Sequence, residues 1–284
     1  MTGYSSTEDL FVGTFQMGRL FLATMLVQVV TAAFLTSPST AQMIVGHRGA
    51  SHDAPENTIA AFNLAWEQDA DGIEGDFYLT ADGQIVCIHD ATTGRTAQKD
   101  ISVTKSTLAE LRVLEVGHWK DAKWRGEVIP TFAEVLATVP KGKTFVIELK
   151  STVEIVEPLK GELDRLDHSG IKLLIISFDE QTIKACKELM PQTRAHWLTS
   201  FKQNASSGAW QPSAGTITGT LRRCGADGVG MQGNTEVIDR AFVQSLTDGG
   251  CREFHVWTID NLEDARYFAG LGAVGITTNR PAFK

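Results

Sequence analysis

The chain has 284 residues, 43% of them hydrophobic and 21% charged, which suits one large α/β domain or two small ones with a full core. Its formal net charge of −8 and the lack of any Lys/Arg run disfavour bulk binding to nucleic acid. An acidic protein can still bind phosphate locally, through a metal ion and a few placed cations.

The N-terminal segment differs from the rest of the chain. Residues 20–35 form an apolar run without a charge, and the sequence Ser39-Thr40-Ala41 that follows is typical of an export cleavage site. We predict that residues 1–41 are a signal peptide and that residues 42–284 are exported to the periplasm or the cell exterior. The alternative is an uncleaved anchor that holds the domain on a membrane outside the cytoplasm, although the run is short for crossing a bilayer.

From residue 43 onward, short apolar runs alternate with amphipathic segments. Apolar runs typical of strands begin near residues 43, 72, 144, 172, 193, 227, 253 and 274. Helical patterns fall near residues 57–66, 108–114, 131–139, 153–167, 180–189, 216–224, 236–247 and 262–271. Repeats of strand then helix predict an α/β fold, with a parallel sheet closed as a (β/α)8 TIM barrel. An open doubly wound sheet is the alternative, but no glycine-rich phosphate loop follows the first predicted strand to support it.

Two stretches depart from this alternation. Residues 91–130 hold no long apolar strand and are predicted to be an insertion over one face of the domain. Residues 199–215 are rich in Ser, Gly and Ala and are predicted to be a loop. The cysteines match no metal-binding spacing, so we expect buried free thiols, with pairing in an oxidising compartment as the alternative. They are Cys87, Cys186, Cys224 and Cys251.

Carboxylates gather at the predicted strand ends, where a barrel carries its chemistry. Glu74 and Asp76 lie two apart on the second run and therefore face the same way, and Glu148 ends the third. Three carboxylates in a low-dielectric pocket repel one another unless a cation neutralises them, and oxygen ligands suit Mg²⁺ or Ca²⁺. The alternative is salt bridging of Glu148 with Lys150 and of Asp76 with Arg48.

Two histidines, His47 and His89, follow apolar runs beside the same acidic cluster. A lone histidine there is more often structural, but two can act as a general acid/base pair. Arg48 and Lys150 flank the proposed metal and would complete a phosphate pocket. This set suits hydrolysis of a phosphodiester, in which one histidine protonates the departing alcohol. The chain lacks a GxSxG or HExxH motif.

These motifs closely resemble the glycerophosphodiester phosphodiesterase family. The matching segments include HRGA (47–50), PENT (55–58), GIEGDFYLTADGQIVCIHD (72–90), RT (95–96), IPTFAEVL (129–136), IELK (147–150), ISFD (176–179), VWTID (256–260) and TNRP (278–281). The resemblance covers essentially all of residues 43–284. It implies a (β/α)8 barrel that hydrolyses glycerophosphodiesters to an alcohol and sn-glycerol 3-phosphate, with a divalent metal, Ca²⁺ or Mg²⁺.

The resemblance also implies a role for each matching residue. The acid/base pair would be His47 and His89, and the metal ligands would be Glu74, Asp76 and Glu148. The groups expected at the substrate are Arg48 and Lys150 on the phosphate and Trp257 on the glycerol side. Two further residues, Glu56 and Asn57, are expected behind these, near the site.

The chain departs from the family pattern in three places. Asn279 stands where the family's ITDxP motif has an acidic residue, the segment AQKD (97–100) lacks the glycine often found after RT, and the loop at 199–215 is divergent. That loop leaves open a related phosphodiesterase acting on lysophospholipids or phosphatidylinositol. A non-catalytic binding barrel is a further alternative. We expect a small-molecule glycerophosphodiester as the partner, no nucleic acid, and membrane contact only if residues 20–35 are retained. The head group, the preferred ion and the oligomeric state stay open.

Overall fold

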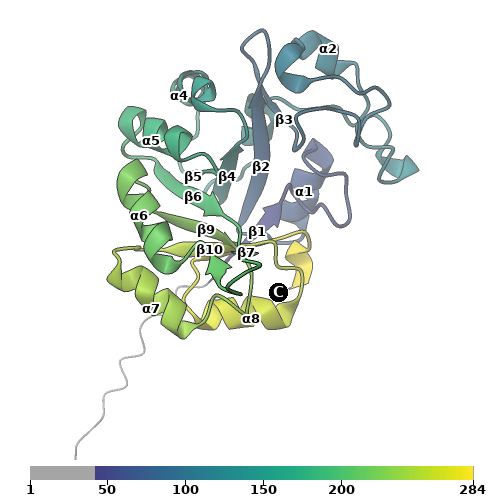
Figure 1. Ribbon diagram of the computed structural model, residues 1–284. Coiled ribbons are helices and arrows are strands. Elements are labelled where there is room, and N and C mark those ends of the chain that lie inside the picture. The colour runs from purple at the N-terminus through teal and green to yellow at the C-terminus, as the bar shows by residue number, and fades with distance from the viewer. Residues whose placement is uncertain (1–41, 284) are drawn as a thin grey trace, which may run out of the picture. The chain divides into compact units, whose positions relative to one another are not determined.

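The computed structural model describes residues 42–283. Its main sheet has nine strands in the order β1-β11-β10-β9-β6-β5-β4-β2-β3, and an additional pairing of β1 with β2 closes the ring (Figure 1). The strands of the ring are parallel: β1 (Met43–His47), β2 (Gly72–Leu79), β4 (Thr144–Leu149), β5 (Lys172–Ser177), β6 (Arg194–Thr199), β9 (Gly228–Gln232), β10 (Phe254–Trp257) and β11 (Gly275–Thr278). The predicted barrel is confirmed, and the open doubly wound alternative is wrong.

Helices lie between successive strands and surround the ring. They are α1 (Ile59–Glu67), α2 (Leu108–Arg112), α3 (Phe132–Leu136), α4 (Val156–Arg165), α5 (Glu180–Leu189), α6 (Ala214–Cys224), α7 (Arg240–Asp248) and α8 (Leu262–Gly270). All of them except α4 start after a capping side chain: Thr58, for example, accepts a hydrogen bond from the Ala61 amide at the start of α1. The helix predicted from residue 236 begins only at Arg240, because Asp239 is the residue that caps it.

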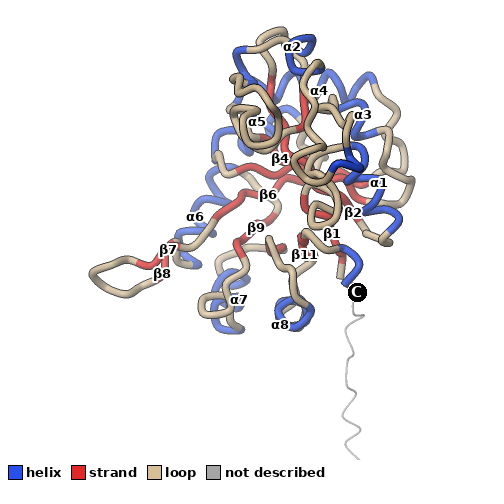
Figure 2. The backbone as a smooth tube through the Cα atoms, turned by 90° about the vertical axis from the view of Figure 1, so that its right-hand side faces the viewer, coloured by secondary structure: helices blue, strands red, loops and turns tan. Residues whose placement is uncertain are grey.

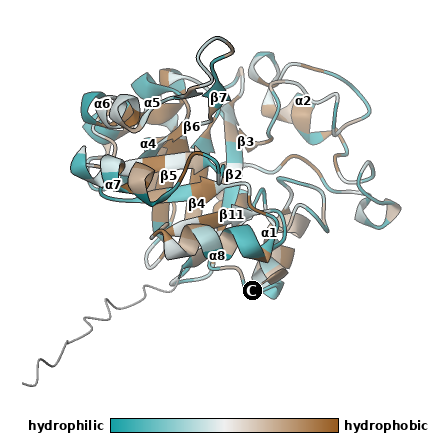
Figure 3. Cartoon of the chain, turned by 60° about the horizontal axis from the view of Figure 1, so that its bottom comes forward, coloured by the Kyte–Doolittle hydropathy of each residue, from teal (hydrophilic) through white to brown (hydrophobic). Residues whose placement is uncertain are grey.

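Two apolar layers hold the barrel together. Inside the ring, buried side chains from β1, β4, β5 and β6 fill the centre: Val45, Val146, Leu174, Ile176 and Leu198. Between the ring and the helices a larger cluster contains Phe62, Phe77, Phe132 and Phe145, each at most 1% exposed. Burying one such phenylalanine side chain stabilises the fold by about 1.5–3 kcal/mol. Figure 3 shows this pattern as apolar strands inside more polar helices.

The chain makes one long excursion between β2 and β4. It begins with β3 (Ile85–Cys87), which returns antiparallel to β2, and continues through the short helices η1 (Val103–Lys105), α2 and η2 (Ala122–Trp124). A separate apolar cluster that includes Val86 and Leu111 packs under it. The excursion therefore has its own small core, and it carries His89 back toward the mouth of the barrel.

Residues 199–215 are more ordered than a plain loop. They contain an antiparallel hairpin of β7 (Lys202–Gln203) and β8 (Trp210–Gln211), which projects from the barrel beside α6 (Figure 2). All four cysteines are buried and unpaired, so the expectation of free thiols is confirmed. Within residues 42–283, no helix is long and apolar enough to cross a membrane. The signal or anchor predicted at 1–41 lies outside the described residues.

Candidate active site

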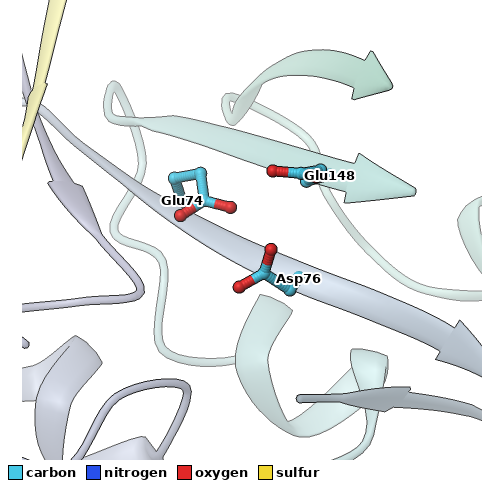
Figure 4. A group of neighbouring side chains, drawn as sticks. All are labelled: Glu74, Asp76 and Glu148. Atoms are coloured by element: carbon cyan, nitrogen blue, oxygen red, sulfur yellow. The ribbon is translucent and has the colours of Figure 1, made fainter. Parts of the chain in front are cut away.

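Three carboxylates converge where β2 and β4 pair. Glu74 and Asp76 lie two apart on β2, and Asp76 is the register partner of Glu148 on β4. All three are buried, and one oxygen from each lies within 4.8 Å of the others (Figure 4). Parallel register and strand alternation are sufficient to place these side chains together, since both positions of β2 face the barrel interior. The structure thus brings together the three residues expected as metal ligands.

The electrostatics of this group are unfavourable without a cation. Burial, together with the neighbouring charges of Asp76 and Glu148, raises the pKa of Glu74 well above its usual value. Burial and the charge of Asp76 raise the pKa of Glu148 to about 7. Burial would raise the pKa of Asp76 as well, but the charges of Arg48 and Lys150 lower it. The cluster therefore resists holding three negative charges on its own.

Ion pairs account for part of this charge. Lys150 Nζ lies 2.9 Å from Glu148 Oε1, and Arg48 Nε lies 3.2 Å from Asp76 Oδ2. These are the salt bridges that were the alternative explanation for the carboxylates. They leave Glu74 Oε1 without a hydrogen bond from any described residue, and Asp76 Oδ1 has only a longer ion pair with Lys150 Nζ, at 3.5 Å.

The residues present fit a divalent cation. Buried polar atoms are normally hydrogen-bonded, so two buried carboxylate oxygens that accept no hydrogen bond within one cluster need an explanation. An all-oxygen donor set is the one that Ca²⁺ and Mg²⁺ prefer. Glu74, Asp76 and Glu148 would hold such an ion, and it would offset the repulsion that raises two of their pKa values.

His47, at the end of β1, is held by the last strand of the barrel. Its Nδ1 lies 2.7 Å from Oδ1 of Asn279, whose own Nδ2 donates to Asp260 Oδ2 at 2.6 Å. Because Asp260 fixes the orientation of this amide, Oδ1 accepts a hydrogen bond from Nδ1–H, and Nε2 of His47 is unprotonated in the neutral ring. Burial, followed by the charge of Arg48, lowers the pKa of His47 to about 4.

His89, which follows β3, has a charged partner instead. Its Nδ1 lies 2.6 Å from Asp90 Oδ1, and Arg95 contacts both Asp90 Oδ2 at 2.5 Å and Glu56 at 2.8 Å. Sequence reasoning missed the roles of Asp90 and Arg95. The RT motif at 95–96 was noted only as part of a family resemblance, and it was the one signal that could have found Arg95.

The PENT segment supports the site from behind. Asn57 has a positive φ of 57°, a conformation that Asn tolerates better than most residues. Its Nδ2 donates to Asp76 Oδ2 at 2.8 Å, and its Oδ1 accepts from the Asp76 amide at 3.2 Å. Glu56 accepts from Arg48 Nη1 at 2.8 Å. Both residues expected near the site therefore contact its members directly.

A cavity of about 120 Å³ joins these groups at the barrel mouth. It is lined by His47, Arg48, Glu74, His89, Glu148, Lys150, Ile176, Phe178, Leu198, His255, Trp257 and Thr277. Trp257 contacts Phe178 edge to face at 5.5 Å, and its buried Nε1 has no hydrogen-bond partner among residues 42–283. Larger cavities of about 320 and 460 Å³ contain none of the predicted site residues.

Several residues that line the cavity carry no sequence signal of a role. They are His255, which faces the same side of its strand as Trp257, and Ile176 and Leu198, which form an apolar wall. Their inward direction follows from strand alternation. Whether they reach the cavity depends on how the eight strands are staggered, and no local sequence motif predicts that stagger.

Comparison with known proteins gives one consistent result. The profile of the Glycerophosphoryl diester phosphodiesterase family matches residues 47–283. A protein of Bacillus subtilis (strain 168), named as a candidate glycerophosphodiester phosphodiesterase, is 35% identical over 246 residues, covering 84% of this chain and 95% of that protein. A Caldanaerobacter subterraneus subsp. tengcongensis protein named glycerophosphodiester phosphodiesterase is 32% identical over 250 residues, covering 84% and 94% of the two chains. The resemblance seen in the motifs is confirmed.

Solved structures agree in fold. A phosphodiesterase of Oleispira antarctica, solved in complex with the product sn-glycerol-3-phosphate, superposes with a TM-score of 0.74 at 25% identity, covering 84% of this chain and 94% of that one. A glycerophosphodiester phosphodiesterase of Thermotoga maritima superposes with a TM-score of 0.66 at 23% identity, covering 85% and 96%, and supports the fold alone.

Proposed function

The chain belongs to the glycerophosphoryl diester phosphodiesterase family and is an enzyme of it, and we propose that it hydrolyses glycerophosphodiesters to an alcohol and sn-glycerol 3-phosphate. The observation that carries this proposal is the buried group Glu74, Asp76 and Glu148. Two of its members, Glu74 and Glu148, line one cavity with His47 and His89. The Oleispira antarctica phosphodiesterase, with sn-glycerol-3-phosphate bound as product, supports the same product here.

The metal requirement is part of the proposal. Glu74, Asp76 and Glu148 would hold Ca²⁺ or Mg²⁺, which when bound supplies positive charge to the phosphate oxygens. Arg48 and Lys150 line the same cavity and would bind the remaining phosphate oxygens as charge-assisted donors. Chelation with EDTA should abolish turnover, and either ion should restore it; full activity after chelation would count against the metal.

The two histidines would divide the proton transfers. Nε2 of His47, in a ring that the neutral Asn279 amide leaves unprotonated there, accepts a proton from the attacking oxygen as that oxygen bonds to phosphorus. The oxygen belongs to water, or to a substrate hydroxyl, in which case water opens the resulting cyclic phosphate in a second step. The bond from phosphorus to the leaving oxygen breaks, and His89 gives its Nε2 proton to that oxygen. Asp90 lies against His89 and balances the charge of the protonated ring.

A change of leaving group tests this assignment. His89→Ala should reduce kcat with glycerophosphocholine by roughly 10²–10⁴-fold, the usual contribution of a general acid. The same variant should retain most activity on the p-nitrophenyl ester of glycerol 3-phosphate, because nitrophenolate leaves without a proton. His47→Ala should lose activity on both substrates. Equal losses for the two variants on both substrates would reject the division of roles.

The small cavity favours a small diester over an intact lipid. Products released from glycerophosphocholine, lysophospholipid and phosphatidylinositol separate the proposed substrate from the two lipid alternatives. Preferential cleavage of either lipid would replace the proposal.

Export is proposed from sequence alone, since residues 20–35 and the cleavage sequence that follows lie outside the described residues. Mass spectrometry of the N-terminus, after expression of the full chain in a bacterial host, is the test. A new terminus at residue 42 in the exported fraction supports a cleaved signal. An intact segment in the membrane fraction would support the anchor.

A further inference from the structure

A second histidine pair lies inside the barrel, and one of its members, His255, lines the cavity. His196 on β6 and His255 on β10 are 0% and 3% exposed, with their Nδ1 atoms 2.9 Å apart and their rings stacked at 5.1 Å. His196 Nε2 lies 2.9 Å from Oε1 of Glu253, and Arg194 Nη2 lies 2.6 Å from the same oxygen. A polar chain thus runs from a partly exposed carboxylate through two buried imidazoles to the cavity.

The neighbouring strand leaves room for both rings. On β9, Gly228 and Gly230 are the register partners of His196 and His255. A Cβ at Gly228 would lie 2.8 Å from His196 Nε2, and a Cβ at Gly230 would lie 2.4 Å from both Cε1 and Nε2 of His255. Any side chain at either position would displace an imidazole, so the sequence GVG is matched to the pair.

The hydrogen bonds fix where each proton lies. Glu253 is ionised, because its bonds to His196 and Arg194 lower its pKa to about 2 against the effect of burial. The ionised Glu253 carboxylate can only accept hydrogen bonds, so Nε2 of His196 carries a proton. Burial lowers the pKa of both histidines and keeps the rings neutral, so Nδ1 of His196 is a bare acceptor and Nδ1 of His255 donates to it. Nε2 of His255 is then left as a bare acceptor.

That nitrogen is available to a ligand. His255 lines the cavity with Leu198, Thr277 and Trp257, and its Nε2 has no hydrogen-bond partner in the part of the chain that the structure describes. Phosphate oxygens, like this nitrogen, are acceptors and cannot pair with it. In glycerophosphocholine the only polar hydrogens belong to the glycerol hydroxyls. A hydroxyl is therefore the group that this position would select.

We propose that the chain Glu253–His196–His255 presents His255 Nε2 as the hydrogen-bond acceptor for a glycerol hydroxyl of the substrate. His255 is then a specificity-determining residue, and Glu253 and His196 are positioning residues that hold its tautomer. The proposal rests on the proposed function for the identity of the substrate. It adds a recognition element outside the acid/base pair, the carboxylates and the phosphate-binding cations.

Two substitutions of His255 distinguish the contribution of Nδ1 from that of Nε2. His255→Asn keeps an amide nitrogen near Nδ1 for His196 and removes the acceptor at Nε2. It should raise KM for glycerophosphocholine about 5- to 10-fold, the usual effect of one hydrogen bond, with kcat changed less than twofold. His255→Gln, whose amide reaches the Nε2 position, should recover part of that loss. The Ki of propyl phosphocholine, which has no glycerol hydroxyl, should stay within twofold in both variants.

A purely structural role would give a different result. If KM for glycerophosphocholine and Ki for propyl phosphocholine rise together, or if neither changes, the proposal is overturned. ¹⁵N NMR of histidine-labelled enzyme gives a reading that does not depend on turnover. Nε2 of His255 should have the shift of an unprotonated nitrogen and should move when sn-glycerol 3-phosphate is added. A protonated Nε2 would reject the tautomer. If Nε2 is unprotonated and moves with sn-glycerol 3-phosphate but the enzyme does not cleave glycerophosphocholine, only the proposed function is rejected.

Discussion

At the scale of single residues, the two proposed acid/base histidines differ in their partners. A neutral amide, Asn279, contacts Nδ1 of His47, whereas the carboxylate of Asp90 contacts Nδ1 of His89. The charge nearest to Asn279 is Asp260, one residue further from His47 in the hydrogen-bonded chain. In the sequence, Asn279 is a departure from the family's ITDxP motif. The structure places it in contact with one of the two proposed acid/base histidines.

Exchanging these two residues tests what the amide does. The double variant Asn279→Asp/Asp260→Asn keeps the hydrogen bond between positions 260 and 279 and leaves the net charge unchanged. It places the carboxylate against His47, where it favours the protonated ring and should raise the pKa by about 1–2 units. His47 must be unprotonated to act as a base, so the acid limb of the kcat/KM profile should move to higher pH by that amount. An unmoved acid limb would mean that another group governs it.

Local sequence predicted the residues that do the proposed chemistry better than the residues that hold them. His47, Glu74, Asp76 and His89 belong to strand ends whose pattern is visible in a short stretch. The contact between His47 and Asn279 spans 232 positions, and that between His196 and His255 spans 59. Such pairs arise only when strands distant in sequence come together in the sheet, so no pattern within a single element indicates them.

At the scale of elements, strand period and capping residues explain most of what was predicted. All eight predicted strands of the ring are present, because buried parallel strands read as short apolar runs between turn signals. Helix ends were less well predicted. The helix predicted over 153–167 is split into a 3-10 turn, η3 (Val153–Ile155), and α4. The β7–β8 hairpin was missed because its two-residue strands are too short to show alternation.

Two short helices carry the same capping box and offer a matched comparison. Thr131 at α3 and Thr107 at α2 each accept a hydrogen bond from the amide three residues on. The backbone amide of each threonine in turn donates to the side chain of the glutamate at that position. Helix α3 buries Phe132, Val135 and Leu136, whereas α2 buries Leu111 alone. Thr131→Ala should lower the free energy of unfolding by about 1 kcal/mol in urea.

The corresponding change at α2 serves as the control. Because α2 lies in the excursion and contributes little to the main core, Thr107→Ala should show mainly as faster amide exchange within that segment. Its effect on the urea midpoint should be clearly smaller than that of Thr131→Ala. Equal shifts of the midpoint would show that the excursion and the barrel unfold as one unit.

At the scale of the whole molecule, the site exists only because the barrel closes. Asp76 and Glu148 are register partners on strands separated by the entire excursion, and His47 reaches the same cavity through the pairing of β1 with β2. The repeat of strand and helix made this closure predictable. The exact stagger of the ring, which sets the cavity and its apolar wall, depends on packing between all strands and was not predictable from the pattern alone.

Closure also concentrates negative charge, which makes stability depend on pH and metal together. Glu148 has a folded pKa of about 7, and that of Glu74 is also raised, so the chelated, metal-free protein holds protons that the unfolded chain releases above its ordinary carboxyl pKa. Where the folded state binds more protons, stability falls as pH rises. The metal-free enzyme should therefore lose stability from this source between about pH 4.5 and about 7.

A divalent ion should reverse this loss. Metal binding needs ionised carboxylates, so Ca²⁺ or Mg²⁺ should raise Tm more at pH 8 than at pH 5. At a concentration 100 times Kd the stabilisation is about 2.7 kcal/mol, which thermal unfolding resolves easily. Glu148→Gln removes one charge and one ligand, so its metal-free form should depend less on pH over this window and its response to the ion should shrink. An equal rise in Tm at both pH values in the wild-type enzyme would show that the ion binds outside these three carboxylates.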